Sequence, residues 1–222
     1  MRDFIRAGSV AEAREIQRSL KRELKIAPFR RPARLIAAAD AIFHERRVFA
    51  AATLFGDCGL FHEQDALACE NIPFDYHPGL LAFREGPAIV AALRKLTATP
   101  EIVLLDGHGI AHPEGFGMAS HIGVILGIPS IGCAKSRLVG EYDEPGPEKG
   151  DWTYLSYRNR RVGAVVRTRA NVRPLFVSPG HLADIETSVE IVLRCLSSYR
   201  IPEPLRRADR LSKMMRSRQP QR

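Results

Sequence analysis

Three carboxylic acids lie in or beside segments of this sequence that otherwise have the composition of a hydrophobic core. Asp40 lies within the apolar run LIAAADAIF, Asp106 ends the run EIVLLD, and Glu85 stands between them in LLAFREGP. A buried carboxylate is costly unless it is paired or holds a metal ion. Three of them on separate elements therefore indicate one shared cation site. Because such oxygen ligands suit hard cations, we expect Mg2+, with Mn2+ as a substitute.

The charge of the chain favours a polyanionic partner. The 222 residues are 45% hydrophobic and 26% charged, as in a globular protein. Lys and Arg total 33 against 25 Asp and Glu, a formal net charge of +8, which is typical of many nucleic-acid-binding proteins. The closing segment RRADRLSKMMRSRQPQR is strongly basic. Its end, from about residue 212 to residue 222, is expected to be a solvated or disordered tail.

The cysteines and the hydropathy pattern argue against several classes of protein. Cys58, Cys69, Cys133 and Cys195 are scattered and form no CxxC pair, which disfavours a zinc knuckle or a disulfide framework. No apolar run is long enough to span a membrane, and the N-terminus lacks the hydrophobic stretch of a signal peptide. We therefore expect a cytoplasmic protein in a reducing compartment that does not contact a membrane.

The first third of the chain predicts one helix and three antiparallel strands. Residues 9–25 have the pattern of a surface helix, with Ser9 and Glu12 at capping-box spacing. Two β-rich runs, 34–43 and 47–55, flank the polar HERR, which is typical of a hairpin. The segment GLFHEQDALAC supplies a third strand, and the short links favour antiparallel pairing.

The remainder of the chain alternates helices and strands. NIPFDYHPGL is a loop, and Pro87, best tolerated in a first helical turn, predicts that the next helix begins near Glu85. We expect one α/β domain over residues 1–222, with a mixed sheet flanked by helices. The other expected strands are EIVLLD, IPSIGCA, YLSYR, VGAVVRT and PLFVS, and the other expected helices are MASHIGVILG and residues 184–198.

The order of strands and acids resembles the ribonuclease H-like fold, and the local strings resemble the endonuclease V family of deoxyinosine-specific endonucleases. They extend over most of the chain from residue 34 onward, and DGHGIAHP combined with PGLLAFRE is a highly specific pair. The strings that carry the resemblance are AAADAIF, DYHPGLLAFREGP, LLDGHGIAHPEGFGMASHIG, IPSIGCAKSRLVG, PLFVSPGH and YRIPEPLRRAD.

The resemblance implies a set of catalytic residues. Asp40, Glu85 and Asp106 would be metal ligands, with Asp40 at the centre. Asp209 matches a fourth ligand position, although on its own it has the character of a surface residue paired with the arginines around it. Lys135 matches the position near the scissile phosphate, whereas the sequence alone favours an ordinary surface lysine.

The resemblance also gives a use to the glycine-dense segment DGHGIAHPEGFG. Positions without a Cβ let the backbone approach a ligand closely, so main-chain groups could read a flipped hypoxanthine base. Most glycine clusters are only tight turns, and the resemblance favours the pocket here. The implied walls of this pocket are Gly79, Leu80, Leu81, Gly107, His112 and Met118.

Tyr76 and Pro78 match the family's wedge, an aromatic loop that fills the gap left by an extruded base. The family pattern is Pro-Tyr-Ile-Pro, and this chain has Asp75 and His77 in place of the first proline and the isoleucine. The loss of one rigid proline predicts a looser loop, and Asp75 would mildly repel phosphates.

The activity implied by the resemblance is that of a hydrolase that incises damaged DNA. It would cut the second phosphodiester bond 3′ to deoxyinosine, leave 3′-hydroxyl and 5′-phosphate ends, and initiate repair. Inosine-containing RNA is a further possible substrate, and the expected state is a monomer. Another ribonuclease H-like nuclease remains an alternative. A sugar or acetate kinase-like phosphotransferase would need a duplicated domain, for which 222 residues leave no room. A non-catalytic nucleic-acid-binding domain is disfavoured because all four ligand positions hold carboxylates.

Overall fold

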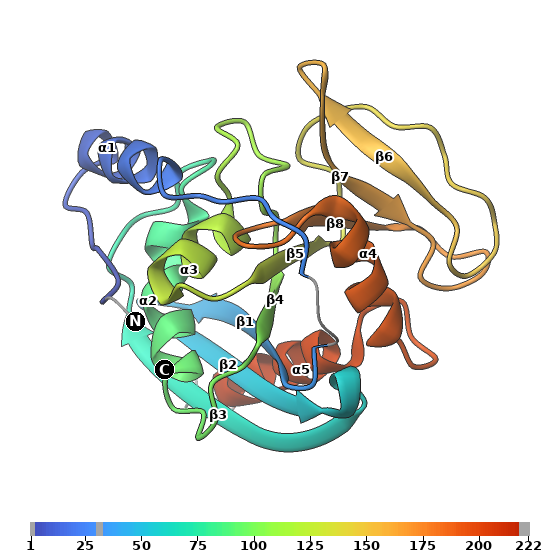
Figure 1. The fold of residues 1–222 in the computed structure, drawn as a ribbon. Coiled ribbons are helices and arrows are strands. Elements are labelled where there is room, and N and C mark those ends of the chain that lie inside the picture. Colours follow the sequence, from blue (N-terminus) through green and yellow to red (C-terminus); the bar gives the residue numbers. More distant parts are fainter. Residues whose placement is uncertain (1–2, 30–32, 218–222) are drawn as a thin grey trace.

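A computed structural model describes residues 3–29 and 33–217, which form a central β-sheet with helices on both faces (Figure 1). The helices are α1 (Val10–Lys21), α2 (Leu81–Leu93), α3 (Met118–Leu126), α4 (Ile185–Arg194) and α5 (Glu203–Ser217), with one 3-10 turn, η1 (Asp57–Gly59). The strands are β1 (Ile36–His44), β2 (Arg47–Gly56), β3 (Phe61–Asn71), β4 (Ile102–Asp106), β5 (Ser130–Ala134), β6 (Trp152–Tyr157), β7 (Arg160–Val166) and β8 (Leu175–Pro179). The α/β domain with a mixed sheet expected from the sequence is confirmed.

The strands form one mixed sheet in the order β3-β2-β1-β4-β5-β8-β7-β6. The first three strands pair antiparallel, as the short links predicted. The central strands β1, β4 and β5 run parallel to one another, and β8, β7 and β6 continue the sheet antiparallel. In open α/β sheets, ligands bind beyond the carboxyl ends of the parallel strands. The end of β4 is therefore the place where a site is expected.

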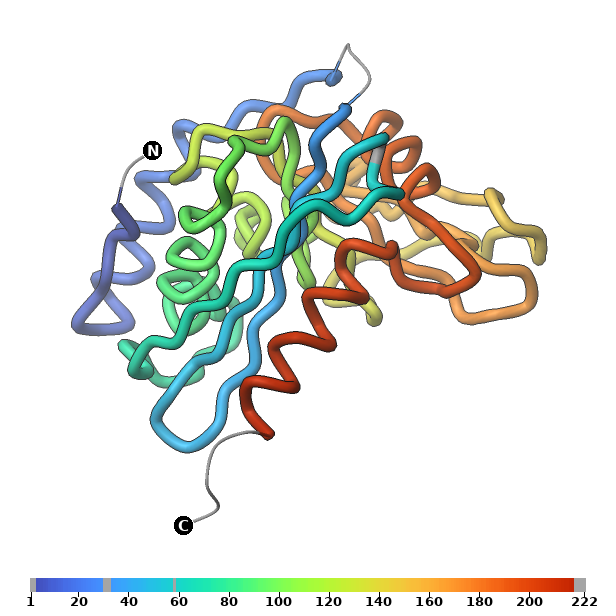
Figure 2. The backbone as a smooth tube through the Cα atoms, turned by 90° about the horizontal axis from the view of Figure 1, so that it is seen from below, coloured from blue at the N-terminus to red at the C-terminus, as the bar shows by residue number. Residues whose placement is uncertain are grey.

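Alternating side chains of the central strands build a core on each face of the sheet. On β4, Val103 and Leu105 pack with α2 and α3, whereas Ile102 and Leu104 pack with α4 and α5. This is the period-2 alternation of a strand that is buried on both faces. Figures 1 and 2 show α1, α2 and α3 on one side of the sheet and α5 on the other.

The helix α1 begins where the sequence predicted it. The Ser9 hydroxyl accepts a hydrogen bond from the Glu12 N–H at 3.2 Å, and the Glu12 carboxylate accepts one from the Gly8 N–H at 2.7 Å. The Ser9 half of the predicted capping box is present, whereas the Glu12 carboxylate accepts from the Gly8 N–H instead of the Ser9 N–H. The helix ends at Lys21, earlier than the expected residue 25.

The predicted start of α2 near Glu85 is wrong. The helix begins four residues earlier, at Leu81, so Pro87 lies in its interior. Proline removes one helical hydrogen bond, here the bond to the Phe83 carbonyl. Ala82 and Phe83 in the first turn are buried, and their packing outweighs that loss.

The expected tail from residue 212 is also corrected, because α5 continues to Ser217. Four of its side chains, Pro204, Leu205, Ala208 and Ser212, are buried, and α5 packs on β1 and β2. This narrow stripe on a strongly charged segment was not recognised in the sequence. Residues 218–222 of the expected tail lie outside the described residues.

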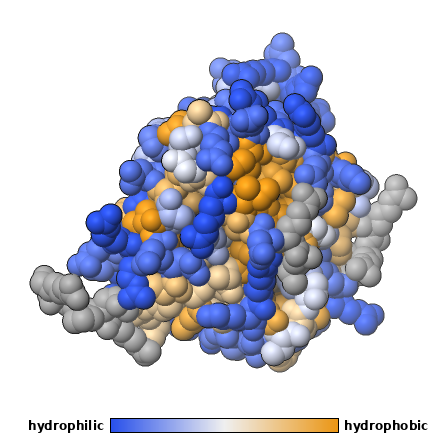
Figure 3. Space-filling view, turned by 90° about the vertical axis from the view of Figure 1, so that its left-hand side faces the viewer, coloured by the Kyte–Doolittle hydropathy of each residue, from blue (hydrophilic) through white to orange (hydrophobic). Residues whose placement is uncertain are grey.

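The surface on the side of α1 is mixed in character. Figure 3 shows hydrophobic residues that reach this surface between borders of hydrophilic ones. Across residues 3–29 and 33–217, no helix combines the length and the apolar character needed to cross a membrane.

Candidate active site

The parallel register of β1 and β4 brings two of the predicted acids together. Ala39 pairs with Leu105, so Asp40 and Asp106 are the next residues on adjacent strands. By strand alternation, both side chains point to the face covered by α5. That helix brings Asp209 to the same place, and one carboxylate oxygen from each of the three aspartates lies within 4.8 Å of the others. A close group of carboxylate oxygens is the donor set of a hard divalent cation.

Asp40 is the most buried member of this cluster of three aspartates, with 8% of its surface exposed. The Ser212 hydroxyl donates a hydrogen bond to its Oδ2 at 2.7 Å. Burial raises the pKa of Asp40 to about 6, against the lowering effect of that hydrogen bond. The charges of Asp106 and Asp209 raise the pKa further. A carboxylate that has lost its water in this way gains strongly from a bound cation.

Two lysines balance the charge of the cluster. Lys135 Nζ lies 2.7 Å from Asp106 Oδ2 and 3.4 Å from Asp209 Oδ1, and Lys213 Nζ lies 2.7 Å from Asp209 Oδ2. Burial alone would lower the pKa of Lys135, but its bond to Asp106 raises that pKa, so the ammonium group stays charged. Burial alone would raise the pKa of Asp209, but the two lysines hold that pKa below its ordinary value.

Glu85 lies beside the cluster and lines the same cavity as Asp40 and Asp106. It projects from the second turn of α2, and the close group itself consists of the three aspartates. Burial raises the pKa of Glu85 to about 8, and the negative charge of Asp40 adds to this shift. The structure thus brings Asp209, rather than Glu85, into closest contact with the two strand acids.

A cavity of about 450 Å³ opens beside the acids and is called the base pocket below, after the base that the sequence resemblance leads us to expect there. Leu80 is a correction to the predicted walls, because it directly precedes α2 and packs its side chain among Phe74 and Phe83 with 1% exposed. Pro78 is exposed and lies outside the lining. The predicted residues that do line the base pocket are Tyr76, Gly79, Leu81, Gly107, His112 and Met118.

Two glycines shape the wall of the base pocket. Gly79 and Gly107 have φ angles of +77° and +134°, which residues with a Cβ rarely adopt. A Cβ at Gly79 would lie 3.3 Å from the His112 ring, and one at Gly107 would lie 3.3 Å from Met118 Cβ. Both positions therefore require glycine because of their backbone conformation and the packing of the wall, and the expected close approach of the backbone to a ligand stays a prediction.

Comparisons with known proteins identify the family. The Endonuclease V family model matches residues 17–210. Endonuclease V of Geotalea uraniireducens (strain Rf4) is 46% identical over 201 residues, covering 90% of this chain and 86% of that protein. The chain belongs to the endonuclease V family. It is therefore a hydrolase, an endonuclease that acts on DNA.

Solved structures of endonuclease V share the fold. The crystal structure from Streptomyces avermitilis superposes with a TM-score of 0.91 at 36% identity, covering 95% of this chain and 94% of that chain. A variant of the Ciona intestinalis endonuclease V has a TM-score of 0.82 at 25% identity, covering 95% and 98%. That protein was solved in complex with a 23mer DNA containing an inosine followed by a ribo-adenosine.

The loop that the sequence resemblance expects to act as a wedge is held on both sides of Tyr76. Tyr76 is 60% exposed and stands at the wall of the base pocket. Before it, buried Phe74 packs against the His77 ring, with centroids 5.5 Å apart. After it, Arg14 donates a hydrogen bond to the Pro78 carbonyl at 3.1 Å. These contacts tie the loop to the core and to α1, and the looser loop expected from the sequence stays a prediction.

Sequence reasoning missed two residues that support the site of this endonuclease V. Ser212 donates a hydrogen bond to Asp40. The available signal for Ser212 was its position three residues after Asp209, on the same face of a helix. Gln17 is buried and donates to the carbonyls of Gly79 and Phe116 at 3.1 and 3.0 Å, which ties α1 to the base pocket. Its signal is its place in a buried helical stripe.

His108 and His121, to which the sequence assigns no metal-ligand role, contact other parts of the protein. The His108 ring lines the base pocket, and its Nε2 lies 3.1 Å from the Ser136 carbonyl. His121 stacks on the Phe4 ring at 4.9 Å between centroids and is fully buried. Neither histidine belongs to the carboxylate cluster.

Proposed function

We propose that this endonuclease V recognises deaminated adenine in DNA and hydrolyses the second phosphodiester bond 3′ to it. The products would carry 3′-hydroxyl and 5′-phosphate ends and would enter DNA repair. The observation that carries the proposal is the meeting of Asp40, Asp106 and Asp209 beside the base pocket of about 450 Å³. The inosine-containing DNA bound to the Ciona intestinalis relative supports the choice of lesion.

The donors of the cluster fit a hard divalent cation, Mg2+ or Mn2+. Asp40, Asp106 and Asp209 would hold it, with Glu85 beside them. The raised pKa of buried Asp40 supports this role, because a cation would replace the water that the carboxylate has lost. When bound, such a cation would activate a water molecule and stabilise charge on the leaving oxygen.

The side chains of the protein would position the strand and the base. Lys135 lines the base pocket and also touches the acids, so its ammonium group is placed to neutralise the scissile phosphate. Burial lowers the pKa of His112 to about 4, so its ring is neutral at pH 7. Its Nδ1 accepts from the Glu114 N–H at 3.2 Å, and its other ring nitrogen donates to the Gly79 backbone. A neutral wall with main-chain groups from Gly79 and Gly107 suits an uncharged base.

Inosine-containing RNA is a second candidate substrate. The DNA bound to the Ciona intestinalis relative carries a ribo-adenosine directly after the inosine. We further propose a monomer that works in the cytoplasm. Light scattering during size-exclusion chromatography tests the oligomeric state, and we expect a mass near the 24.7 kDa of one chain.

Mapping the incision tests the proposed function. Two 5′-labelled duplexes that differ only by inosine or adenosine at one position are incubated with the protein and Mg2+. The inosine duplex should yield one product that ends one nucleotide 3′ to the inosine, and the adenosine duplex should stay intact. Binding without cleavage would favour the non-catalytic alternative, and equal cleavage of both duplexes would favour another ribonuclease H-like nuclease. A parallel inosine-containing RNA measures the relative preference for the two nucleic acids.

The raised pKa of Glu85 predicts how stability depends on pH. Its folded pKa of about 8 lies above the ordinary value of 4.5. Between these values the folded protein holds a proton that the unfolded chain has released, so the unfolding free energy falls as the pH rises. The metal-free protein should therefore lose stability relative to a Glu85→Gln variant from about pH 4 to about pH 8.

Thermal melts with and without Mg2+ check this prediction. Because the ligands must be ionised, Mg2+ should raise the melting temperature of the natural protein more at about pH 8.5 than at about pH 6. Glu85→Gln should reduce that difference. A Mg2+ effect of the same size at both pH values, in both proteins, would contradict the assignment of buried acids as ligands.

Tyr76→Ala should weaken lesion recognition more than it slows the chemical step. Insertion of the ring would offset part of the cost of flipping a base, roughly a few kcal/mol. The acids are untouched, so bound substrate should still be cleaved. A single-stranded inosine substrate has less stacking to break and should be affected less than a duplex. Single-turnover cleavage and affinity on both substrates measure this, and equal losses on both would leave Tyr76 as a packing residue.

A further inference from the structure

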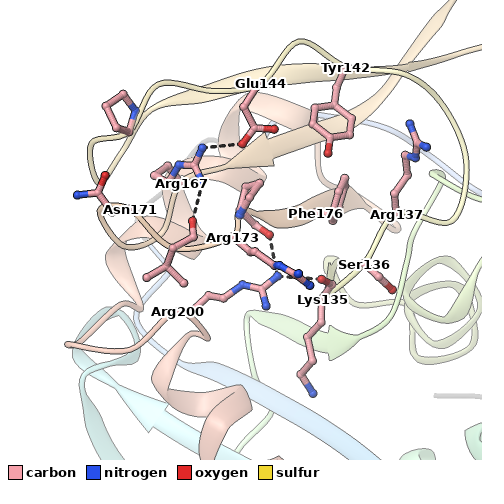
Figure 4. Close-up of a pocket in the computed structure, with 13 residues that line it drawn as sticks. Lys135, Ser136, Arg137, Tyr142, Glu144, Arg167, Asn171, Arg173, Phe176 and Arg200 are labelled. Atoms are coloured by element: carbon pink, nitrogen blue, oxygen red, sulfur yellow. Dashed lines mark hydrogen bonds and ion pairs between the residues drawn. The ribbon is translucent and has the colours of Figure 1, made fainter.

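A second, more basic cavity adjoins the active site (Figure 4). It has a volume of about 780 Å³ and is called the arginine cavity below. The lining of the arginine cavity contains one carboxylate, that of Glu144, and five positively charged side chains. The positive side chains are Lys135, Arg137, Arg167, Arg173 and Arg200.

Arg167 forms part of the wall of the arginine cavity. It is buried, and its guanidinium donates to Glu144 Oε1 at 2.7 Å and to the carbonyls of Gly146 and Val172 at 2.9 and 2.5 Å. Figure 4 shows the pairing of Arg167 with Glu144 at the upper side of the cavity. The charge of Glu144 is therefore already paired, so the acid does not neutralise the remaining arginines.

Arg173 and Arg200 supply charge that lacks an acidic partner. Arg200 donates to the carbonyls of Lys135 and Pro174 at 2.8 and 2.7 Å, while its buried Nε has no hydrogen-bond partner among the described residues. Arg173 is exposed and has no hydrogen bond or ion pair within the described part of the chain. Figure 4 shows the two side chains next to each other. Two neighbouring guanidinium groups without an acid are suited to a phosphate, whose oxygens match their planar donors.

The arginine cavity and the base pocket meet at one stretch of chain. Lys135, Ser136 and Arg137 line both of them. The other residues of the arginine cavity come from 142–147, from 167–176 and from Arg200, none of which lines the base pocket. The two cavities therefore share the segment 135–137 as a common wall, and Lys135 also contacts Asp106 and Asp209.

We propose that the arginine cavity binds phosphates of the nucleic-acid strand on the 3′ side of the cleaved bond. This inference rests on the proposed function, in which the inosine occupies the base pocket and lies 5′ to that bond. A strand that passes from the base pocket over Lys135 continues into the arginine cavity. Arg173 is the exposed group that contacts its phosphates, while Arg200 holds the Lys135 carbonyl and is a positioning residue.

Arg173→Ala, compared on two inosine-containing strands, tests the proposal. The strands share one 5′ arm, and the 3′ arm ends either two or eight nucleotides after the inosine. On the long strand, the variant should bind roughly 3- to 10-fold more weakly, and the salt slope of its log affinity should fall by about one. On the short strand, which ends one nucleotide after the cleaved bond, affinity and cleavage rate should match those of the natural protein.

Arg18→Ala is the matched control because it removes the same charge from α1. That helix lies on the other side of the molecule from the β6–β7 hairpin (Figures 1 and 2). Arg18→Ala should show no dependence on the length of the 3′ arm. Equal weakening of both strands by Arg173→Ala, no weakening of either, or the same effect from Arg18→Ala would overturn the proposal.

The result separates this proposal from the proposed function. If the natural protein cleaves inosine strands and only the dependence on arm length is missing, the arginine cavity is wrongly assigned and the function stands. If the natural protein does not prefer inosine strands over adenosine strands, the proposed function fails, and the assignment of the 3′ arm falls with it.

Discussion

Replacing Asp40 with asparagine should reduce strand cleavage by roughly 10³-fold or more, a loss of about 4 kcal/mol in transition-state stabilisation. Asp40 is the most buried acid of the cluster, and the charges of both Asp106 and Asp209 raise its pKa. An amide offers one neutral oxygen where the carboxylate offers two charged ones. Asp106→Asn should have a comparable effect, which single-turnover rates at saturating Mg2+ measure.

The fold of Asp40→Asn should be intact. The amide oxygen can still accept the hydrogen bond from Ser212, and a neutral group removes the cost of a buried charge. The metal-free variant should therefore melt at the same temperature as the natural protein at pH 8, or higher. Asp57→Asn is the matched control, because Asp57 is exposed on η1 and asparagine tolerates its positive φ angle. Near-normal cleavage by Asp40→Asn would remove this residue from the site.

Lys135→Met should reduce cleavage by roughly 10²- to 10³-fold, the usual effect of losing one group that stabilises developing charge. Its ammonium group lies where the base pocket and the cluster meet. In the metal-free protein the same group also pairs with Asp106, so its loss removes a competitor for the cation. The affinity for Mn2+, measured by calorimetry, should stay equal or increase while the cleavage rate falls.

Lys213→Met shows whether Lys135 acts through its position at the base pocket or only through its positive charge near Asp209. Lys213 and Lys135 both pair with Asp209, and among the two only Lys135 lines the base pocket. Lys213→Met should change the cleavage rate far less than Lys135→Met. Equal losses in the two variants would show that the lysines act only by balancing the charge of Asp209.

The parts of the site that lie on strands could be predicted from the sequence. Asp40 and Asp106 interrupt apolar runs, and a buried acid on a strand is conspicuous because it is costly. Their contact follows from the pairing of β1 with β4, since parallel neighbours bring equivalent positions together. The mixed sheet could also be predicted from local patterns, because short links indicated antiparallel strands at the start and helices alternate with strands later in the chain.

The parts that depend on long-range packing could not be predicted in this way. The close contact of Asp209 with the strand acids requires α5 to return to β1, and its narrow apolar stripe is hidden among charged residues. The start of α2 was misplaced because the buried first turn outweighs the local preference of Pro87. Leu80 faces the core because of the path of the preceding loop, which residue type alone does not determine.

No single sequence motif marks the arginine cavity as a whole. Its walls come from the end of β5, the loop before β6, the loop between β7 and β8, and the turn before α5. Scattered arginines in such loops look like ordinary surface residues until the fold brings them together. Their contribution to binding is therefore visible only in three dimensions.

Cleavage of an inosine-containing duplex by chelator-treated protein, before and after the return of Mg2+, tests the central claim most directly. Asp40, Asp106 and Asp209 are proposed to act through a divalent cation, so the treated protein should leave the duplex intact. Addition of Mg2+ or Mn2+ should restore incision, and the Asp40→Asn variant should stay inactive under both conditions. Undiminished incision in the presence of excess chelator would contradict the metal-dependent mechanism.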